Sequence, residues 1–315
     1  MQLTPDQQRL WKIFHPKAAE EESTIIKHNI RFVHYTSAAT VLKVLSTKRI
    51  WMRKTSCMND YREVLHGLDC LVRAYDHSHF GKTFKTTLDS MFEGFSTKIQ
   101  HLFNSWIQNI QNHTYISCFS EHRPEGDFFG RLSLWRAYGV NTGAAFVLNN
   151  SAFQLSPDLL KVYASPVAYL SEEVFQQEFG RIVDNINAEV AFLKNRGQDK
   201  IMDCVFRMFR FAIVSTKNPC FQEENEWRLI YSPPLEDSHL LKKTNEIIQG
   251  VPQPIYHLPL EGIPGVEVPS FIDRLIIGPT QYPQALCEAF IDSLTEFGVH
   301  EPQSKVHWCK IPLRT

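Results

Sequence analysis

The segment FQEENEWRLIY, residues 221–231, constrains the fold most, because it places three acidic residues directly before a run typical of a buried strand. Side chains alternate across a strand, so residues two apart share a face. The apolar set, which we expect to face the core, is Trp227, Leu229 and Tyr231. The opposite face then carries Glu224, Glu226 and Arg228. The simplest interpretation of that charged face is a solvated surface on which Arg228 partly neutralises Glu226. The alternative is that it lines a cleft or meets a partner.

Strand and helix patterns follow one another irregularly along the chain. Strands are predicted at residues 31–36, 50–54, 113–120, 143–149, about 160–168, 226–231, 254–258, 273–278 and 305–310. Helices are predicted directly after Thr36 or Ser37, over 59–75, about 82–111, 132–139, about 171–214 and about 282–297. Gly139 is expected to end the helix that precedes it. The glycine patterns of phosphate-binding and dinucleotide-binding loops are absent, so the sequence predicts an α+β fold and not a doubly wound one.

The domain organisation is predicted to be simple. The chain contains no internal repeat, no low-complexity tract and no Gly/Ser linker. We therefore expect a single elaborated domain over residues 1–315, in which the stretch of about 171–214 forms a helical insertion.

Composition excludes several classes of function. The chain has 33 basic and 34 acidic side chains, a balance that gives no broad electrostatic footprint for nucleic acid or an anionic membrane. No leader pattern and no apolar run of membrane-spanning length is found, so we expect a cytoplasmic protein without membrane contact. Seven cysteines without short pairings favour reduced core residues over a disulfide framework, and no metal site is expected.

Six short motifs, read together, carry a family resemblance. They are HYTS at 34–37, MNDYRE at 58–63, CFSE at 118–121, LWRAYG at 134–139, EENEWRL at 223–229 and RLIIGP at 274–279. This set resembles an uncharacterised bacterial family, domain of unknown function 2971. A more distant similarity is to mono-ADP-ribosyltransferases, which combine an Arg or His on a first strand, a Ser or Tyr element on a second, and a Glu-x-Glu pair leading into a third.

The transferase resemblance implies a set of site residues. The first-strand residue would be His34 or Arg31, and the serine would be Ser117 or Ser120. Glu226 would hold a ribose hydroxyl of NAD, the substrate, and stabilise the oxocarbenium-like state that forms when nicotinamide leaves. Glu224 would position or deprotonate the acceptor. The aromatic wall for the nicotinamide ring would come from Tyr35, Trp135 or Tyr138.

The same resemblance implies a core of two small packed β-sheets with flanking helices. It also requires the three site strands to be neighbours, because one NAD must touch all three. The macromolecular acceptor, protein or nucleic acid, stays unspecified. Two other interpretations are open: a non-catalytic binding module of the same fold that contacts a partner protein, and a metal-dependent enzyme that uses Asp60, Glu63 and the acidic pair as ligands. A helix cap explains Asp60 and Glu63 equally well.

Overall fold

The computed structural model describes residues 4–58, 63–139, 142–153, 160–248, 250–263 and 268–311. Ten of the described strands form one connected sheet, and two more form a separate parallel pair. The sheet runs in the order β12-β11-β4-β1-β3-β2-β10-β9, with β8 on the other edge of β3 and β5 beyond it. The α+β prediction is confirmed, but one branched sheet takes the place of the two small packed sheets that the resemblance implied.

The predicted strands are present with similar bounds, but β7 and β9 were not predicted. The strands of the large sheet are β1 Arg31–Ser37, β2 Arg49–Lys54, β3 Tyr115–His122, β4 Gly143–Leu148, β5 Tyr163–Pro166, β8 Glu226–Tyr231, β9 Lys242–Ile248, β10 Val251–Pro259, β11 Ile272–Ile277 and β12 Val306–Trp308. The parallel pair is β6 Ala168–Tyr169 and β7 Thr216–Lys217.

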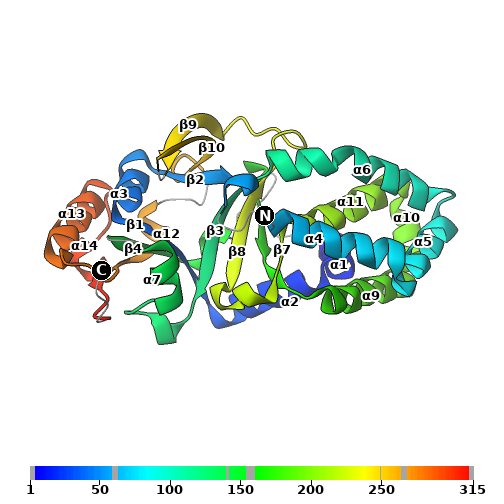
Figure 1. Cartoon of the computed structure of the whole chain (residues 1–315), viewed down its shortest axis with the longest axis horizontal. Coiled ribbons are helices and arrows are strands. Elements are labelled where there is room, and N and C mark those ends of the chain that lie inside the picture. The colour runs from blue at the N-terminus through cyan, green and yellow to red at the C-terminus, as the bar shows by residue number, and fades with distance from the viewer. Residues whose placement is uncertain are drawn as a thin grey trace.

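Strand β3 is the junction of the sheet. Its one edge is shared by two strands, because β1 pairs with residues 120–122 and β2 with residues 115–116. Its other edge pairs with β8 over residues 115–120. Two wings of the sheet therefore diverge from one side of β3, and the β1 and β2 pairings leave residues 117–119 between them. Figure 1 shows β3 and β8 at the centre of the molecule.

Most helices gather at one end of the molecule, to the right in Figure 1. This helical lobe consists of α1 Pro5–Phe14, α4 Glu63–Val72, α5 His79–Met91, α6 Phe95–His113, α9 Glu172–Ala188, α10 Val190–Arg196 and α11 Gln198–Val214. The stretch predicted as a helical insertion is helical, as α9 to α11. It does not stand alone, because α9 and α11 contact α1, α4, α5 and α6 from the first third of the chain.

The remaining helices lie along the sheet. They are α2 Pro16–His28, α3 Ala38–Thr47, α7 Leu132–Tyr138, α12 Val268–Phe271, α13 Pro283–Glu296 and α14 Pro302–Lys305. Ser37 caps α3, as its Oγ accepts the Thr40 N–H at 3.1 Å. Gly139 ends α7 as predicted, and a Cβ there would lie 2.7 Å from the Trp135 carbonyl oxygen. The helix cap predicted from Asp60 and Glu63 lies outside the described part of the structure, because Asp60 and the side chain of Glu63 are not described.

Three clusters of apolar side chains form the core. The largest lies on the sheet face that carries Trp227, Leu229 and Tyr231, as the alternation predicted. The opposite face is covered by two different bodies. Ile116 and Ile230 pack into the core of the helical lobe, whereas Val33 and Val147 pack with Trp135 of α7. A seam between the lobe and α7 therefore crosses this second face at β3 and β8. No helix among the described residues is long and apolar enough to cross a membrane.

Candidate functional site

The three strands predicted to carry the site are neighbours, as the transferase resemblance required. Val33 of β1 is paired with Ser120 of β3, and Ser120 is paired with Glu226 of β8. Paired residues of antiparallel strands project to the same face. Ser120 and Glu226 therefore lie together on the second face of the sheet, in the seam between the lobe and α7.

The charged face of β8 is buried, so its interpretation as a solvated surface is wrong. Glu226 is 5% exposed and Arg228 is 0% exposed. The sequence pattern separates the two faces of β8 correctly, because Glu226 and Arg228 do lie opposite the apolar set. What covers them comes from outside the strand, namely the end of α11 and the segment that follows it, with Val214 and Lys217.

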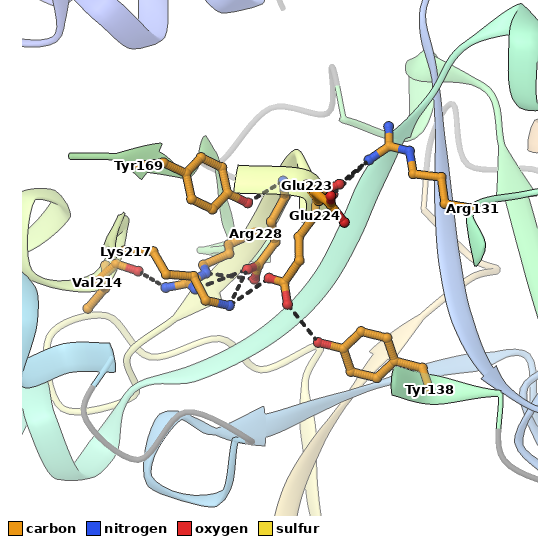
Figure 2. Close-up of polar contacts among 9 residues, drawn as sticks. Arg131, Tyr138, Tyr169, Val214, Lys217, Glu223, Glu224 and Arg228 are labelled. Atoms are coloured by element: carbon orange, nitrogen blue, oxygen red, sulfur yellow. Dashed lines mark hydrogen bonds and ion pairs between the residues drawn. The ribbon is translucent and has the colours of Figure 1, made fainter. Parts of the chain in front are cut away.

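Four charged side chains form a compact network in the seam (Figure 2). Arg228 donates through Nε to Glu226 Oε1 at 2.8 Å and through Nη2 to Glu226 Oε2 at 3.2 Å. Lys217 Nζ lies 3.2 Å from Glu226 Oε2 and 2.7 Å from Glu224 Oε2. A third donor of Arg228, Nη1, binds the Val214 carbonyl oxygen at the end of α11. The two carboxylates thus share one ammonium group.

Glu224 reaches this network from a turn and not from the strand. It is the last residue of the 3₁₀ helix η5 Pro219–Glu224, and Asn225 follows with a left-handed φ of 40° that turns the chain into β8. The Arg131 guanidinium fixes this turn by donating to the carbonyl oxygens of Glu223 at 2.7 Å and Glu224 at 3.2 Å. Backbone contacts, and not side-chain alternation, therefore decide where Glu224 points.

Two tyrosine hydroxyls complete the surroundings of the carboxylates. Tyr138, the last residue of α7, donates to Glu224 Oε1 at 3.2 Å. Tyr169 of β6 accepts the backbone N–H of Glu226 at 2.8 Å. Figure 2 shows Tyr138 and Lys217 meeting the Glu224 side chain from different elements. The site is thus assembled from α7, β6, β7, η5 and β8.

Burial and the charges of the network act against each other on the pKa values of Glu226 and Lys217, and both pKa values are raised on balance. Burial raises the pKa of Glu226, and the Lys217 charge opposes that rise. Desolvation alone would lower the pKa of Lys217, but the Glu226 and Glu224 carboxylates outweigh it and raise that pKa. Burial and the nearby Glu226 raise the pKa of the Cys118 thiol, so Cys118 is a neutral neighbour. Lys217 consequently keeps its charge throughout the physiological range.

The structure separates the alternatives that the sequence left open. His34 lies on the face opposite Glu226, because it follows Val33 on β1 and its ring contacts Phe119 of the main core at 5.4 Å. Its Nδ1–H donates to the Cys118 carbonyl oxygen at 2.8 Å, in the gap between the two wings of the sheet. Burial lowers the pKa of His34. A neutral imidazole that bridges two strands is the arrangement of a structural histidine.

Ser117 also lies on the opposite face, where it is paired with Leu229. Arg31 shares the face of Glu226, but its guanidinium is bound by Asp127 and, at 2.6 Å, by Asp273. Of the alternatives, Ser120 is therefore the one that the structure brings beside Glu226. Neither of the two candidates for the first-strand residue, His34 and Arg31, joins the charged network of the seam.

The three predicted aromatic residues have different surroundings. Tyr138 touches Glu224, as described. Trp135 is buried and donates from Nε1 to the Phe129 carbonyl oxygen at 2.6 Å. Tyr35 contacts the Trp135 ring edge to face at 4.8 Å, and its hydroxyl accepts the Arg131 N–H at 2.8 Å. Only Tyr138 meets the charged network directly, whereas Tyr35 supports the arginine that holds the Glu224 turn.

A cleft of about 760 Å³ adjoins this turn. Its lining includes Tyr35, Arg131 and Arg136, together with Glu223 and Asn225 on either side of Glu224. Arg131 binds backbone carbonyls and Arg136 is exposed. The cleft is within the range of volumes, roughly 300–1,000 Å³, that hold small ligands.

Three important residues of the seam escaped the sequence interpretation: Lys217, Tyr169 and Arg131. Lys217 precedes Glu226 by nine positions, and a lysine shortly before a Glu-x-Glu pair was the available signal. Tyr169 and Arg131 lie far away in sequence and gave none. Among the residues that the structure describes, no group of three or more His, Cys, Asp or Glu side chains is placed to hold a metal ion.

Comparison with known proteins finds a family model that matches part of the chain. Residues 134–229 match the family described as "Protein of unknown function (DUF2971)". The matched stretch contains Tyr138, Lys217, Glu224 and Glu226, the side chains that meet in the seam. It excludes the first strand with His34. No curated protein and no solved structure matches the chain.

Proposed function

We propose that this protein is an ADP-ribosyltransferase-like enzyme that uses NAD as a substrate and either transfers ADP-ribose to a macromolecule or hydrolyses NAD. The observation that carries the proposal is the carboxylate pair Glu224 and Glu226 on one ammonium group, beside Ser120 and Tyr138, where β1, β3 and β8 adjoin. Burying charged groups costs stability even when they are paired. Titratable groups held in such surroundings are candidates for a functional site.

Departure of nicotinamide defines what the carboxylates must do. The bond between the ribose anomeric carbon and the nicotinamide nitrogen breaks, and its electron pair leaves with nicotinamide. Positive charge develops on the ribose, and a nearby carboxylate stabilises it. An oxygen of water or of the acceptor then forms the new bond to the anomeric carbon, and its proton passes to a carboxylate that acts as base.

Accessibility divides these roles between the two glutamates. Both oxygens of Glu226 are bound by Arg228 or Lys217, and its side chain is 6% exposed. The Glu224 side chain is 17% exposed, and its Oε1 accepts a hydrogen bond from the neutral Tyr138 hydroxyl. We therefore assign Glu224 to the ribose cation and the acceptor proton, and Glu226 to holding Lys217 in position. Glu224 thus keeps the acceptor role that the resemblance implied and also takes over the role at the ribose cation that the resemblance gave to Glu226.

The neighbouring cleft supplies a place for the rest of NAD in this proposal. Arg136 is exposed at its wall and suits a diphosphate group, whereas the Arg131 guanidinium is occupied by the carbonyl oxygens of the Glu224 turn. Tyr35, which the resemblance assigned to the cofactor, lines the same cleft. The proposal also includes a core related to that of ADP-ribosyltransferases, in which the wings that begin at β1 and β2 correspond to the two sheets.

Purified protein incubated with labelled NAD tests this function. We expect release of nicotinamide, or labelling of the protein itself or of an extract component. Glu224→Gln should lower the rate of release by about a hundredfold or more, because the amide keeps the size and loses the charge opposite the cation. Glu296→Gln, an exposed glutamate at the end of α13 that does not line the cleft, is the matched control and should stay within about twofold of the wild type.

The competing candidate is a non-catalytic binding module of the same fold. Its support is the internal balance of the network, in which two carboxylates face two cations and every member is buried or half-buried. In that case calorimetry should detect no NAD binding, and neither variant should change any NAD-dependent signal. The partner would then meet the exposed cleft wall, because the acidic pair itself is covered. Asp60, which the metal-dependent alternative requires, lies outside the described residues.

A further inference from the structure

Strand β9 lies at one end of the large sheet, where β10 is the one described strand that pairs with it. Its seven residues, KKTNEII at 242–248, are all exposed or half-buried. Figure 1 shows the β9–β10 hairpin at the top of the molecule. The other two ends of the sheet, β12 and β5, have three and four residues. Strand β9 is therefore the longest strand at an end of the described sheet.

Two prolines of β10 show which backbone groups of β9 point outward. In an antiparallel ladder, both residues of a hydrogen-bonded pair donate an N–H, and proline has none. Pro252 is paired with Ile247 and Pro254 with Asn245, so neither is a hydrogen-bonded pair. The N–H and C=O groups of Asn245 and Ile247, and by alternation those of Lys243, therefore point away from β10.

The side chains at this edge are as open as its backbone. Lys243, Asn245 and Ile247 are exposed. At 71%, Ile247 is more exposed than any other large apolar side chain that the structure describes. An edge strand with outward backbone groups is a template for pairing with another strand.

The sequence of β9 is complementary to itself. When two copies pair antiparallel about a two-fold axis perpendicular to the sheet, the residue on the axis lies opposite its own copy. An axis at Lys243 or Glu246 places like charges opposite each other, and an axis at Asn245 aligns no opposite charges. An axis at Thr244 places Lys242 opposite Glu246 of the partner subunit, on both sides of the axis.

The axis at Thr244 also suits the backbone. Lys243 and Asn245, whose backbone groups face outward, then form the hydrogen-bonded pairs across the interface. Lys242, Thr244 and Glu246 fall at non-hydrogen-bonded pairs, where opposite side chains approach most closely. Opposite charges and paired threonines stabilise a sheet at such positions.

Glu246 has room for a second cation. Lys43 binds its Oε2, and its Oε1 lies 4.0 Å from His257 Nε2, beyond hydrogen-bond distance. Lys242 is exposed and reaches this oxygen from the partner subunit in the arrangement described.

We propose that this protein forms a homodimer in which two β9 strands pair antiparallel about Thr244, so that the sheets of the two subunits become continuous. The occupant of the edge is a second copy, because the spacing of Lys242 and Glu246 matches itself in the reversed direction. This interface goes beyond the NAD chemistry proposed above and does not depend on it.

Sedimentation equilibrium of the full chain over a range of concentrations tests the dimer. We expect a reversible monomer–dimer equilibrium. Asn245→Pro removes an N–H directed at the partner subunit and none directed at β10, so the subunit should fold and dimerise about tenfold or more less strongly. A wild type that stays monomeric at about 1 mM would overturn the proposal. A dimer that Asn245→Pro leaves unchanged would place the interface elsewhere and overturn it as well.

Charge reversal tests the register. Lys242→Glu and Glu246→Lys each place like charges opposite each other at both sites, so each variant alone should dimerise about tenfold or more less strongly. An equimolar mixture of the two should recover the wild-type affinity, because every acidic position then faces a basic one. Lys82→Glu, the same charge change on an exposed residue of α5, is the control and should dimerise normally.

A mixture that associates no better than its components would contradict the pairing of Lys242 with Glu246. Should Glu246→Lys not fold beside Lys43, the comparison of Lys242→Glu with Lys82→Glu still decides, and equal affinities of these two variants would overturn the register.

Discussion

The helical lobe and the seam beside it are both buried, but they are held together by different forces. The lobe interior is filled with aromatic rings such as Phe84, Phe179 and Phe209, which contact one another at 5.3–6.0 Å between centroids. The seam is filled with two carboxylates, an ammonium and a guanidinium. Burial of apolar surface stabilises the lobe in proportion to its area. Burial of the charges in the seam is tolerated only while every charge keeps its partner.

This difference predicts how each region responds to change. Apolar cores tolerate substitutions that keep volume and shape, and the penalty grows with the cavity that is left. A buried ion network has no such gradation, since removal of one member leaves another charge without compensation. The seam, which contains the candidate site, is therefore the region in which substitutions should be tolerated less well.

The largest effect is expected for Arg228→Met. This change removes both contacts with Glu226 and the donor to the Val214 carbonyl oxygen. We expect a loss of about 3–5 kcal/mol in the free energy of unfolding, because Glu226 would stay buried with less compensation. Urea denaturation of the variant against the wild type measures it.

The matched comparison is Leu88→Ala in the lobe, where Leu88 is 0% exposed. That loss should also be about 2–5 kcal/mol, from transfer and cavity terms. The two regions then differ in rescue. Adding Glu226→Gln to Arg228→Met should restore at least about half of the loss, because it removes the uncompensated charge. A double variant no more stable than Arg228→Met would show that charge balance is not what holds the seam.

The sequence was sufficient for most of the elements, though not for α1, α2, β7 and β9, and for the two faces of β8. Alternation alone assigned Trp227 and Tyr231 to the core and Glu226 and Arg228 to the other side. It was not sufficient to show that the charged side is covered. That coverage depends on Lys217 and Val214, which follow or end a helix whose own pattern only indicates an amphipathic surface. Periodicity shows which face of an element is apolar, but not what packs on its polar face.

The choice between candidate residues required the register of the strands. His34 and Arg31 lie on one strand with opposite orientations, as do Ser117 and Ser120. A shift by a single position exchanges the two faces of a strand, and nothing within the segment RFVHYT fixes that position. The branching of the sheet at β3 also has no local signal, because it arises where two distant strands share one edge.

An intermediate effect is expected from His122, which is 3% exposed at the end of β3 beside Arg31 and Asp127. Burial, reinforced by the Arg31 charge, lowers its pKa to about 4 from 6.5. The unfolded state therefore binds the proton more readily. His122 contributes stability that is fully present above pH 6.5 and is lost as the pH falls towards 4.

The free energy of unfolding should fall with pH in this window by up to about 1.4 kcal/mol per unit from His122. Between pH 7 and pH 5, the free energy of unfolding should fall by about 2 kcal/mol less in His122→Gln than in the wild type. His34, whose pKa is also lowered by burial, continues to contribute in the same direction, so the dependence should not vanish. Urea midpoints at pH 8, 6.5 and 5 measure it, and parallel curves for the variant and the wild type would contradict the assignment.

The smallest effect concerns an ion pair of the lobe surface, which sharpens the contrast with the seam. Arg9 donates to Glu189 at 3.2 Å, much as Lys217 binds Glu226, but the Arg9 side chain is 51% exposed. Water solvates both side chains well when they are not paired, so Arg9→Gln should lower the free energy of unfolding by less than about 1 kcal/mol. Raising the salt concentration from about 0.05 to 0.5 M should remove most of that difference, because exposed charges are screened.

The seam pair should be insensitive to the same change, which denaturation of Lys217→Gln at both salt concentrations tests. A loss above about 2 kcal/mol for Arg9→Gln that persists in high salt would mean that exposed and buried pairs stabilise this protein alike. Burial would then not be what makes the charges of the seam costly to remove.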